Sequence, residues 1–185
     1  MLILHLIIFL FTTLSSCSTP NQEIIWTQDR KLSWSDFKGK SKPVEGSDVA
    51  AVTRCGISMQ TNSVTGHQKP VFYVQAVFYK DQSWYRKDMP MTAAILNHEQ
   101  KHFDLCEVYA RQLRKKFHVA NLNAQNLTKE ANRIFNDVNS QYLERQTLYD
   151  KETRHGQEAS EQAKWNDLIA KELVALEEFS KWAES

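Results

Sequence analysis

Glycine and proline are scarce in this chain of 185 residues, which contains only five and four of them. With so few, and with no stretch of low complexity, the sequence excludes repeat proteins and disordered proteins. An excess of one charge is also missing, because 23 Lys and Arg balance 22 Asp and Glu. Nucleic acid is therefore not an expected partner. The length and the hydrophobic fraction of 42% fit one folded domain.

Long hydrophobic runs are absent except at the start, where residues 1–13 are almost continuously apolar. This run is too short to cross a bilayer as a helix and ends in small residues, as export signals do. The following Leu-Ser-Ser-Cys resembles the bacterial lipobox, whose cysteine becomes the lipidated first residue. We therefore predict a lipoprotein signal peptide at residues 1–16, a single domain at 17–185, and a membrane anchor on Cys17.

Cysteine is also rare, and only Cys55 and Cys106 remain after Cys17. An exported chain meets an oxidising compartment, where a disulfide between these two residues is permitted. The sequence does not give their geometry, so a disulfide and two buried thiols both stay open.

The first half of the chain has the patterns of strands. Residues 48–60 and 71–79 are rich in Val, Ile, Thr and aromatic side chains, and turn-forming residues occupy 61–70 between them. These segments predict an antiparallel pair of strands.

The second half has the patterns of helices. A first helix is predicted over residues 92–117, and a second carries an apolar stripe at spacings of three and four from Leu127 to Tyr142. Residues 149–156 are predicted to form a polar connection to a third helix over about 157–183. Strands followed by helices indicate the α+β class, a small antiparallel sheet and then about three helices.

His98 and His102 of the segment HEQKH lie in the first predicted helix. One helical turn separates them, so both imidazoles share a face and can converge on one ion. Imidazole suits Zn²⁺, and a catalytic zinc site keeps three protein ligands and a water. Glu99 lies about 100° around the helix from His98, where a carboxylate can take a proton from water and pass it to a leaving amine. The segment predicts zinc as the cofactor and Glu99 as a catalytic residue.

A third zinc ligand must come from outside HEQKH. His67 falls in a predicted turn, and His118 lies at the end of the first helix beside two lysines. A hairpin of helices would bring His155, which follows the second helix, back toward His98. His155 is therefore the predicted third ligand.

Other side chains remain alternatives around this site. Three carboxylates are the alternative third ligands: Glu130, Glu144 and Glu152. Asp150 or Glu152 is expected to accept the free N–H of a ligand histidine and so orient its ring. Cys106 lies one turn beyond His102, and its thiolate would be a fourth ligand that closes the site into a structural one.

The segments NHEQKHFD and YDKETRHG resemble a bacterial family of predicted secreted zinc-dependent proteases, catalogued mainly as a domain of unknown function. The resemblance spans most of the chain after residue 16, including WSDFKG at residues 34–39. It implies a zincin-like protein with zinc on His98 and His102 and catalysis by Glu99. It also implies importance for five further residues: Asp104, Tyr149, Asp150, Thr153 and His155.

The leading interpretation is a zinc metallopeptidase that cuts peptides or proteins in the bacterial cell envelope. A lipid on Cys17 would anchor the protein to a membrane there. Glu99 would move the proton, and a tyrosine or a backbone N–H would donate a hydrogen bond to the developing oxyanion. Tyr149 is the predicted tyrosine, because the alternative, Tyr142, fits the apolar stripe of the second helix. The second interpretation is a non-catalytic zinc-binding or structural lipoprotein, in which the site only holds the helices together. A third is an envelope interaction protein without a metal.

Overall fold

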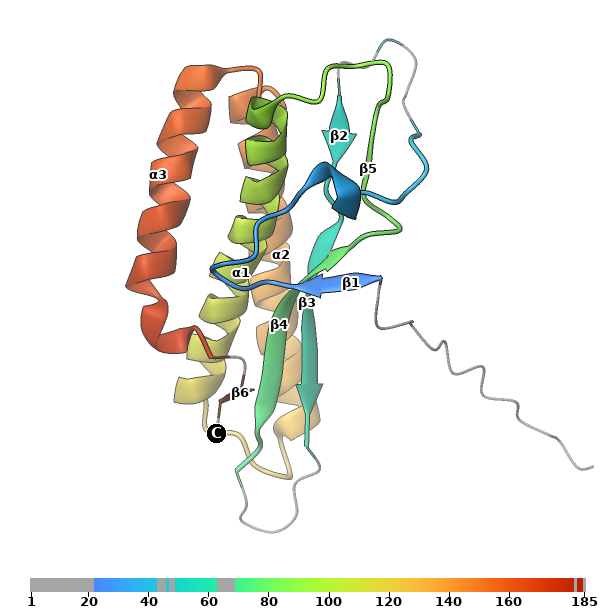
Figure 1. Cartoon of the computed structure of the whole chain (residues 1–185). Helices are drawn as coiled ribbons and strands as arrows, with labels where there is room; N and C mark the ends of the chain where they lie inside the picture. Colours follow the sequence, from blue (N-terminus) through green and yellow to red (C-terminus); the bar gives the residue numbers. More distant parts are fainter. Residues whose placement is uncertain (1–21, 43–45, 47–48, 63–68, 182, 185) are drawn as a thin grey trace, which may run out of the picture.

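The structure is a computed structural model that describes residues 22–42, 46, 49–62, 69–181 and 183–184. Antiparallel strands lie on one side and three long helices on the other (Figure 1). The strands precede the helices in the chain, except for a short strand at the end, so the predicted α+β class is confirmed. The predicted signal peptide at 1–16 and Cys17 lie outside the described residues. In the described part of the chain, no helix is long and apolar enough to cross a membrane.

The main sheet is built on β4 (Phe72–Tyr79), whose side chains are mostly buried. Strand β3 (Cys55–Thr61) runs antiparallel along one edge of β4, as predicted, with Cys55 opposite Phe78. The other edge pairs with β1 (Glu23–Ile25) and, near the C-terminus, with β6 (Ala183–Glu184). The sheet thus ties both ends of the described chain together.

A second ribbon of two strands consists of β2 (Ala51–Val52) and β5 (Trp84–Tyr85). The prediction of one continuous strand over 48–60 is therefore wrong, since this segment forms two strands, β2 and β3, that belong to different sheets. The chain leaves the ladder between them because Arg54 N bonds the buried Ser83 Oγ at 2.9 Å and Thr53 Oγ1 bonds the Glu99 carbonyl at 3.3 Å. These bonds place the ribbon against the HEQKH segment.

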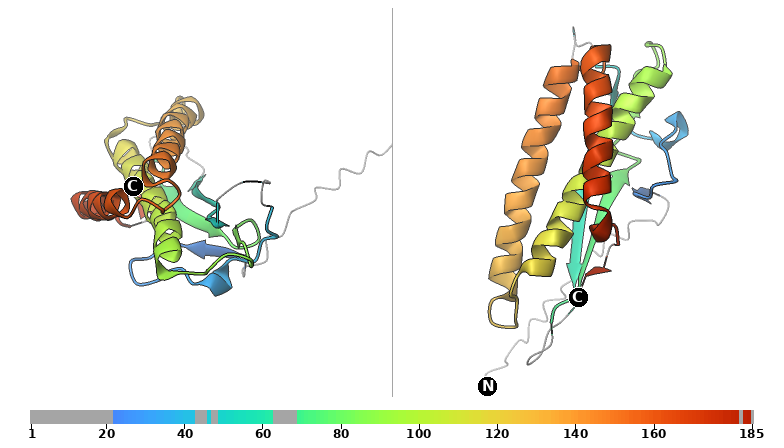
Figure 2. Two further views of the ribbon diagram at one scale, coloured as in Figure 1. Left: turned by 90° about the horizontal axis from the view of Figure 1, so that it is seen from above. Right: turned by 90° about the vertical axis from the view of Figure 1, so that its left-hand side faces the viewer.

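Helix α1 (Ala93–Val119) is the centre of the molecule. It begins at Thr92, whose Oγ1 accepts a hydrogen bond from Ile95 N at 3.2 Å, which satisfies a free N–H of the first turn. The sheet and the other two helices surround it (Figure 2). Several of its apolar side chains are therefore fully buried: Phe103, Leu105, Cys106, Val108, Ala110 and Leu113.

Helix α2 (Leu127–Thr153) is longer than predicted, and the polar connection predicted at 149–156 is wrong over its first half. Nothing in Tyr-Asp-Lys-Glu-Thr breaks a helix, and Tyr149 and Thr153 continue the buried face as fully buried side chains. The helix ends where Arg154 takes a left-handed conformation with φ 49°. Tyr149 and Asp150 are thus fixed on a helix and not in a loop.

Helix α3 (Ala159–Ala175) is shorter than the predicted 157–183. The chain turns at Leu176 into the 3-10 helix η2 (Glu177–Phe179), which buries Phe179, and then into β6. Arg114 stabilises this turn because its Nη1 donates to the Phe179 carbonyl at 2.9 Å. The tertiary contact overrides the helical pattern of the sequence.

The lead-in segment before β2 is held by a polar contact to α1. Trp26 Nε1 donates to Asp104 Oδ1 at 2.9 Å, and both side chains are buried. Farther along, η1 (Trp34–Asp36) packs Trp34 on Phe37 and Tyr85. Asp104 therefore anchors the lead-in segment to α1.

Candidate metal centre

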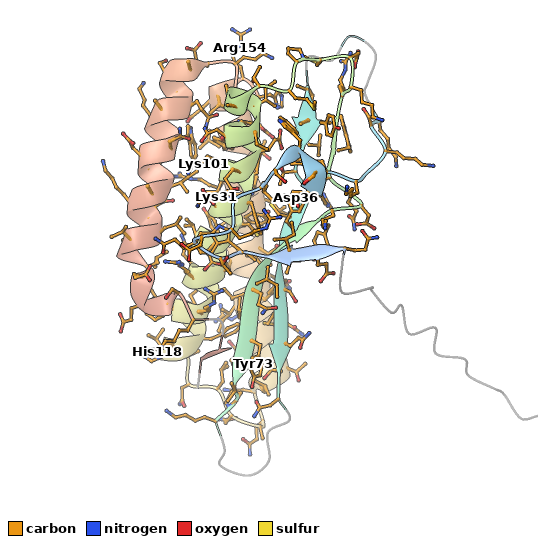
Figure 3. All side chains as sticks on the ribbon, viewed as in Figure 1. Lys31, Asp36, Tyr73, Lys101, His118 and Arg154 are labelled. Atoms are coloured by element: carbon orange, nitrogen blue, oxygen red, sulfur yellow. The ribbon has the colours of Figure 1, made fainter. Side chains whose placement is uncertain are left out.

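The candidate metal centre lies where the end of α2 returns to the first half of α1. Arg154, at the α2 end, and His118, near the end of α1, lie at opposite ends of the helical layer (Figure 3). His118 therefore takes no part in the centre, and its ring instead packs against Phe179 with centroids 6.0 Å apart. The antiparallel packing of α1 and α2 brings His98 and His102 opposite Asp150.

Three ligand atoms form a nearly equilateral triangle. His98 Nε2 lies 3.1 Å from His102 Nε2, and Asp150 Oδ1 lies 3.2 Å from the first and 3.0 Å from the second. Ligands bound about 2.0–2.1 Å from a tetrahedral zinc stand about 3.3–3.4 Å apart. The spacing and the N, N, O donor set therefore fit one zinc-sized cation.

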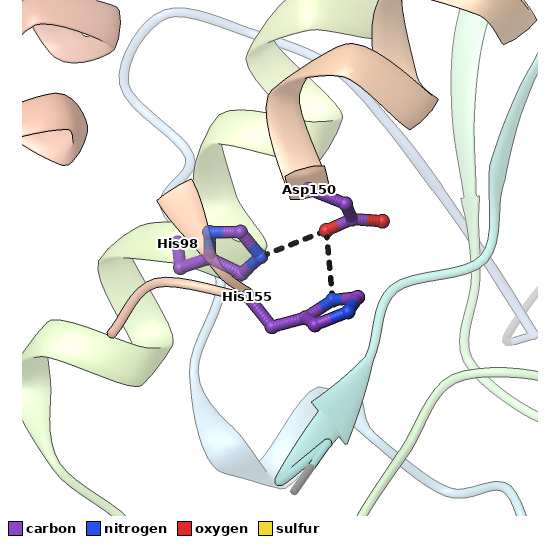
Figure 4. A group of neighbouring side chains, drawn as sticks. All are labelled: His98, Asp150 and His155. Atoms are coloured by element: carbon purple, nitrogen blue, oxygen red, sulfur yellow. Dashed lines mark hydrogen bonds and ion pairs between the residues drawn. The ribbon is translucent and has the colours of Figure 1, made fainter. Parts of the chain in front are cut away.

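His155 joins this group from the turn after α2. Its Nδ1 lies 3.3 Å from Asp150 Oδ1, so Asp150 touches both His98 and His155 (Figure 4). The ligand atoms of His98, Asp150 and His155 all lie within 4.8 Å of one another, which makes them a group that could hold a metal ion. His155 is also the exposed member, with 42% of its side chain accessible.

The turn that carries His155 has an unusual backbone. Arg154, His155 and Gly156 have φ values of 49°, 54° and 80°, so three consecutive residues are left-handed. Such conformations cost non-glycine residues energy and occur often where a site demands them. Gly156 is required here, because a Cβ on it would lie 2.9 Å from Cβ and Cγ of His98. The turn therefore packs directly against a candidate ligand.

The charges of the centre support each other. Burial alone would raise the pKa of Asp150, but hydrogen bonds from His102 and His98 hold it well below its usual range. Burial alone would lower the pKa of His102, yet the hydrogen bond and charge of Asp150, helped by the charge of Glu99, raise it to about 9. In the metal-free chain an ionised Asp150 thus faces a protonated His102 at neutral pH.

Glu99 is buried beside this centre, with 3% of its surface accessible. Its Oε2 is the one buried side-chain N or O atom in the described part of the chain without a hydrogen-bond partner. A buried polar atom left unpaired costs about 1–3 kcal/mol, so such an atom calls for a functional reason. Its charge also raises the pKa values of His102 and Tyr149, so Glu99 lies close to both.

Tyr149 is fully buried and stacks on His98, with ring centroids 4.7 Å apart and planes at 20°. Its hydroxyl lies 3.2 Å from the His98 carbonyl and 3.0 Å from Gln162 Oε1, both of which can accept its proton. Burial raises its pKa. The predicted oxyanion role of Tyr149 stays a prediction, and its contacts are those of a residue that positions His98.

The remaining predicted candidates lie apart from the centre. Each alternative carboxylate has another partner: Glu130 bonds Arg133, Glu144 bonds Ser140, and Glu152 accepts from Trp165 Nε1 at 2.8 Å. His67 lies outside the described residues. The Cys55 and Cys106 side chains are free thiols, so of the two open alternatives the structure has the unpaired one.

Sequence reasoning missed two kinds of residue at this site. Asp150 was expected only to orient a histidine, yet its Oδ1 lies among the imidazoles as a candidate ligand. Gln146 and Gln162, which contact the Nδ1 atoms of His102 and His98, were not singled out. The spacing of four residues between Gln146 and Asp150 could have indicated a shared face if the predicted second helix had included both.

The comparisons with known proteins identify a family but no activity. A family model described as "Bacterial protein of unknown function (DUF922)" matches residues 36–156, which is more than half of the chain, so the chain belongs to this family. The matched segment includes HEQKH and ends at Gly156. No curated protein and no solved structure matches.

Proposed function

We propose that this member of the DUF922 family is a zinc-dependent metallopeptidase, with His98, His102 and Asp150 as zinc ligands and Glu99 as the general base. The observation that carries the proposal is the unpartnered, buried Oε2 of Glu99 beside two convergent imidazoles. In a purely structural site, a desolvated carboxylate oxygen without a hydrogen bond would only cost stability. In a hydrolase, the same oxygen can accept a proton from water as the general base.

The choice of ligands follows from the distances. His98, His102 and Asp150 have mutual separations of 3.0–3.2 Å. His155 Nδ1 lies 3.3 Å from Asp150 Oδ1 and within 4.8 Å of the ligand atom of His98. His155 is also the exposed residue, on the strained turn. We assign it the fourth position, where a side chain can give way to an incoming substrate. This assignment revises the sequence-based choice of His155 as third ligand.

Zinc, when bound, supplies Lewis-acid chemistry by lowering the pKa of a water and polarising a carbonyl. The chain's own residues supply the rest. Glu99 Oε2 accepts the proton of the attacking water and returns it to the leaving amine. Tyr149 holds His98 by stacking on its ring and bonding its carbonyl.

The proposed cellular location rests on the residues that precede and include Cys17. The apolar run at residues 1–13 and the lipobox-like segment before Cys17 support export and lipid anchoring in the bacterial cell envelope. The substrates would be peptides or proteins of that compartment.

A second function is favoured by one observation. With His155 bound, four protein ligands would fill a tetrahedral shell, which is the mark of a structural zinc site. The alternative is therefore a zinc-stabilised envelope lipoprotein that cuts no bond.

The test compares the chain from residue 17 onward with Glu99→Gln, His98→Ala and a control, Glu144→Gln, which changes an exposed carboxylate on α2. Zinc content is measured by elemental analysis, and turnover with a mixture of quenched fluorescent peptides. We expect one zinc per chain in all but His98→Ala, which should lose turnover together with its metal. Glu99→Gln should keep its zinc and lose about 10²–10⁴-fold in turnover, and Glu144→Gln should match wild type. A zinc-loaded wild type whose peptide cleavage is absent or survives Glu99→Gln would refute the peptidase. A wild type without zinc would refute the metal site.

A further inference from the structure

Two glutamines from different helices contact the two histidines of HEQKH. Gln162 on α3 places its Oε1 3.0 Å from His98 Nδ1, and Gln146 on α2 places its Oε1 against His102 Nδ1. In each ring, Nδ1 thus faces an amide oxygen and Nε2 faces the candidate metal position. The same arrangement occurs twice in one site.

The orientation of Gln146 leaves one protonation pattern for His102. Its Nε2 donates to the His102 carbonyl at 2.9 Å, and a carbonyl can only accept. The amide oxygen must therefore face His102 Nδ1, and that nitrogen must carry a proton. Nε2 of the neutral ring is then left with its lone pair, as a metal ligand requires.

The orientation of Gln162 is fixed by a partly buried chain of hydrogen bonds. Its Nε2 donates to Tyr149 OH at 2.7 Å and to Asn166 Oδ1 at 2.9 Å, and Asn166 Oδ1 also accepts from Asn97 at 3.2 Å. Only 8% of Gln162 is accessible. Its Oε1 therefore faces His98 Nδ1, which must also donate.

The partners are amides, although carboxylates often fill this position. A carboxylate on Nδ1 raises the basicity of the ligand and adds negative charge near the ion. Glutamine fixes the ring without adding charge. Among the three proposed ligands, Asp150 is then the only one that brings a negative charge, and the ion keeps more of its Lewis acidity.

We propose that Gln146 and Gln162 are positioning residues that fix both imidazoles with the proton on Nδ1, and that α3 is part of the metal site. The proposal rests on the proposed zinc site. Gln162 lies beyond the segment 36–156 that matches the family model, so the family match does not contain it. The site extends into a helix that the motif does not reach.

The experiment measures zinc affinity by competition with a chromophoric chelator, on the chain from residue 17 onward. Gln162→Leu and Gln146→Leu remove the acceptors, Gln162→Glu keeps an acceptor at the same place, and Gln141→Leu changes an exposed glutamine on α2. We expect both leucine variants to bind zinc about 10–100-fold more weakly. Gln162→Glu and Gln141→Leu should bind within a few-fold of wild type or more tightly.

A second readout is the ¹⁵N spectrum of the histidine rings in the zinc-loaded protein, which distinguishes a proton on Nδ1 from one on Nε2. Wild type should show Nδ1–H on both rings. Unchanged affinity in both leucine variants, or Nε2–H in wild type, would overturn the proposal. If Gln162→Leu does not fold, Gln146→Leu and the spectrum still decide. A wild type that binds no zinc contradicts the proposed function itself, whereas zinc binding that ignores the glutamines contradicts only this inference.

Discussion

Gly156→Ala tests how the turn after α2 supports the metal centre. Gly156 has φ 80°, and a Cβ added to it would lie 2.9 Å from Cβ and Cγ of His98. Atoms of this kind do not approach so closely. His98 Cβ is fixed by the backbone of α1, so a rotamer change of His98 cannot relieve the contact. Either the turn or the imidazole must move.

Gly46→Ala is the matched control. Gly46 has a similar φ of 77°, but a Cβ there meets nothing within 4 Å. Both substitutions place alanine in the left-handed region, at about 1–2 kcal/mol, and both reduce the freedom of the unfolded chain equally. Only Gly156→Ala adds crowding, which costs about 1–3 kcal/mol in a packed site. The difference between the two variants isolates the contact with His98.

The assay is urea unfolding in the presence of a chelator, followed by zinc competition on the same proteins. We expect Gly46→Ala to lose about 1–2 kcal/mol of unfolding free energy and Gly156→Ala about 2–5 kcal/mol. If the imidazole shifts from Asp150 and His102, zinc affinity should fall about tenfold or more in Gly156→Ala alone, equal to about 1.4 kcal/mol. Equal losses of stability and unchanged zinc binding would refute the argument.

Two further predictions concern the ligands. Asp150→Ala should weaken zinc binding more than about 100-fold, as measured by chelator competition, because it removes a ligand of the triangle. His155→Ala should weaken zinc binding about tenfold or less. The reverse order would restore His155 as third ligand. Zinc affinity should also depend on pH, because the pKa of His102 in the metal-free chain is raised to about 9. Below that pH zinc must displace a proton from His102, so affinity should rise about tenfold per pH unit from 6.5 to 9 and then level off. The corresponding stability of the metal-free chain is present below pH 6.5 and lost as pH rises through 9. Affinity that stays flat over this range in calorimetric titrations would contradict the ion pair of His102 with Asp150.

The HEQKH helix and the strands could be predicted because their signals are local. Thr92 precedes a run of helix formers, and the two histidines share a face at any register of an α-helix. The strand pair 55–61 and 72–79 shows the β-branched and aromatic residues typical of buried strands. Each of these predictions needed only a few neighbouring residues.

The extent of α2 could not be predicted in the same way. YDKETRHG is polar, and polar residues without proline or a mid-segment glycine fit either a loop or the end of a helix. Packing of Tyr149 on His98 and of Thr153 in the core decides for the helix. The error had a consequence, because an Asp150 placed in a loop has no defined direction, whereas on α2 its carboxylate points at α1.

The burial of three charged side chains on α1 could not be predicted from the sequence either. Glu107, Arg111 and Arg114 recur on α1 at spacings of four and three, which is typical of a solvated helix face. In the structure all three are at most 2% exposed, and Glu107 Oε1 accepts from both arginines at 3.0 and 2.9 Å. The arginines also bond the carbonyls of Val74, Leu173 and Phe179, so they join α1 to β4, α3 and η2. These acceptors come from distant segments that no local pattern reveals.

The turn between α2 and α3 explains why ligands and positioning residues from three helices meet. Asp150 is the fourth residue from the end of α2, and Gln162 is the fourth of α3. Both must reach the imidazole of His98, so the chain has to reverse within the few residues between Thr153 and Ala159. Three consecutive left-handed residues achieve this reversal. A longer or relaxed connection would leave His98, His102 and Asp150 in place but move Gln162 away from His98. The backbone strain is therefore best understood as the cost of adding α3 to the site.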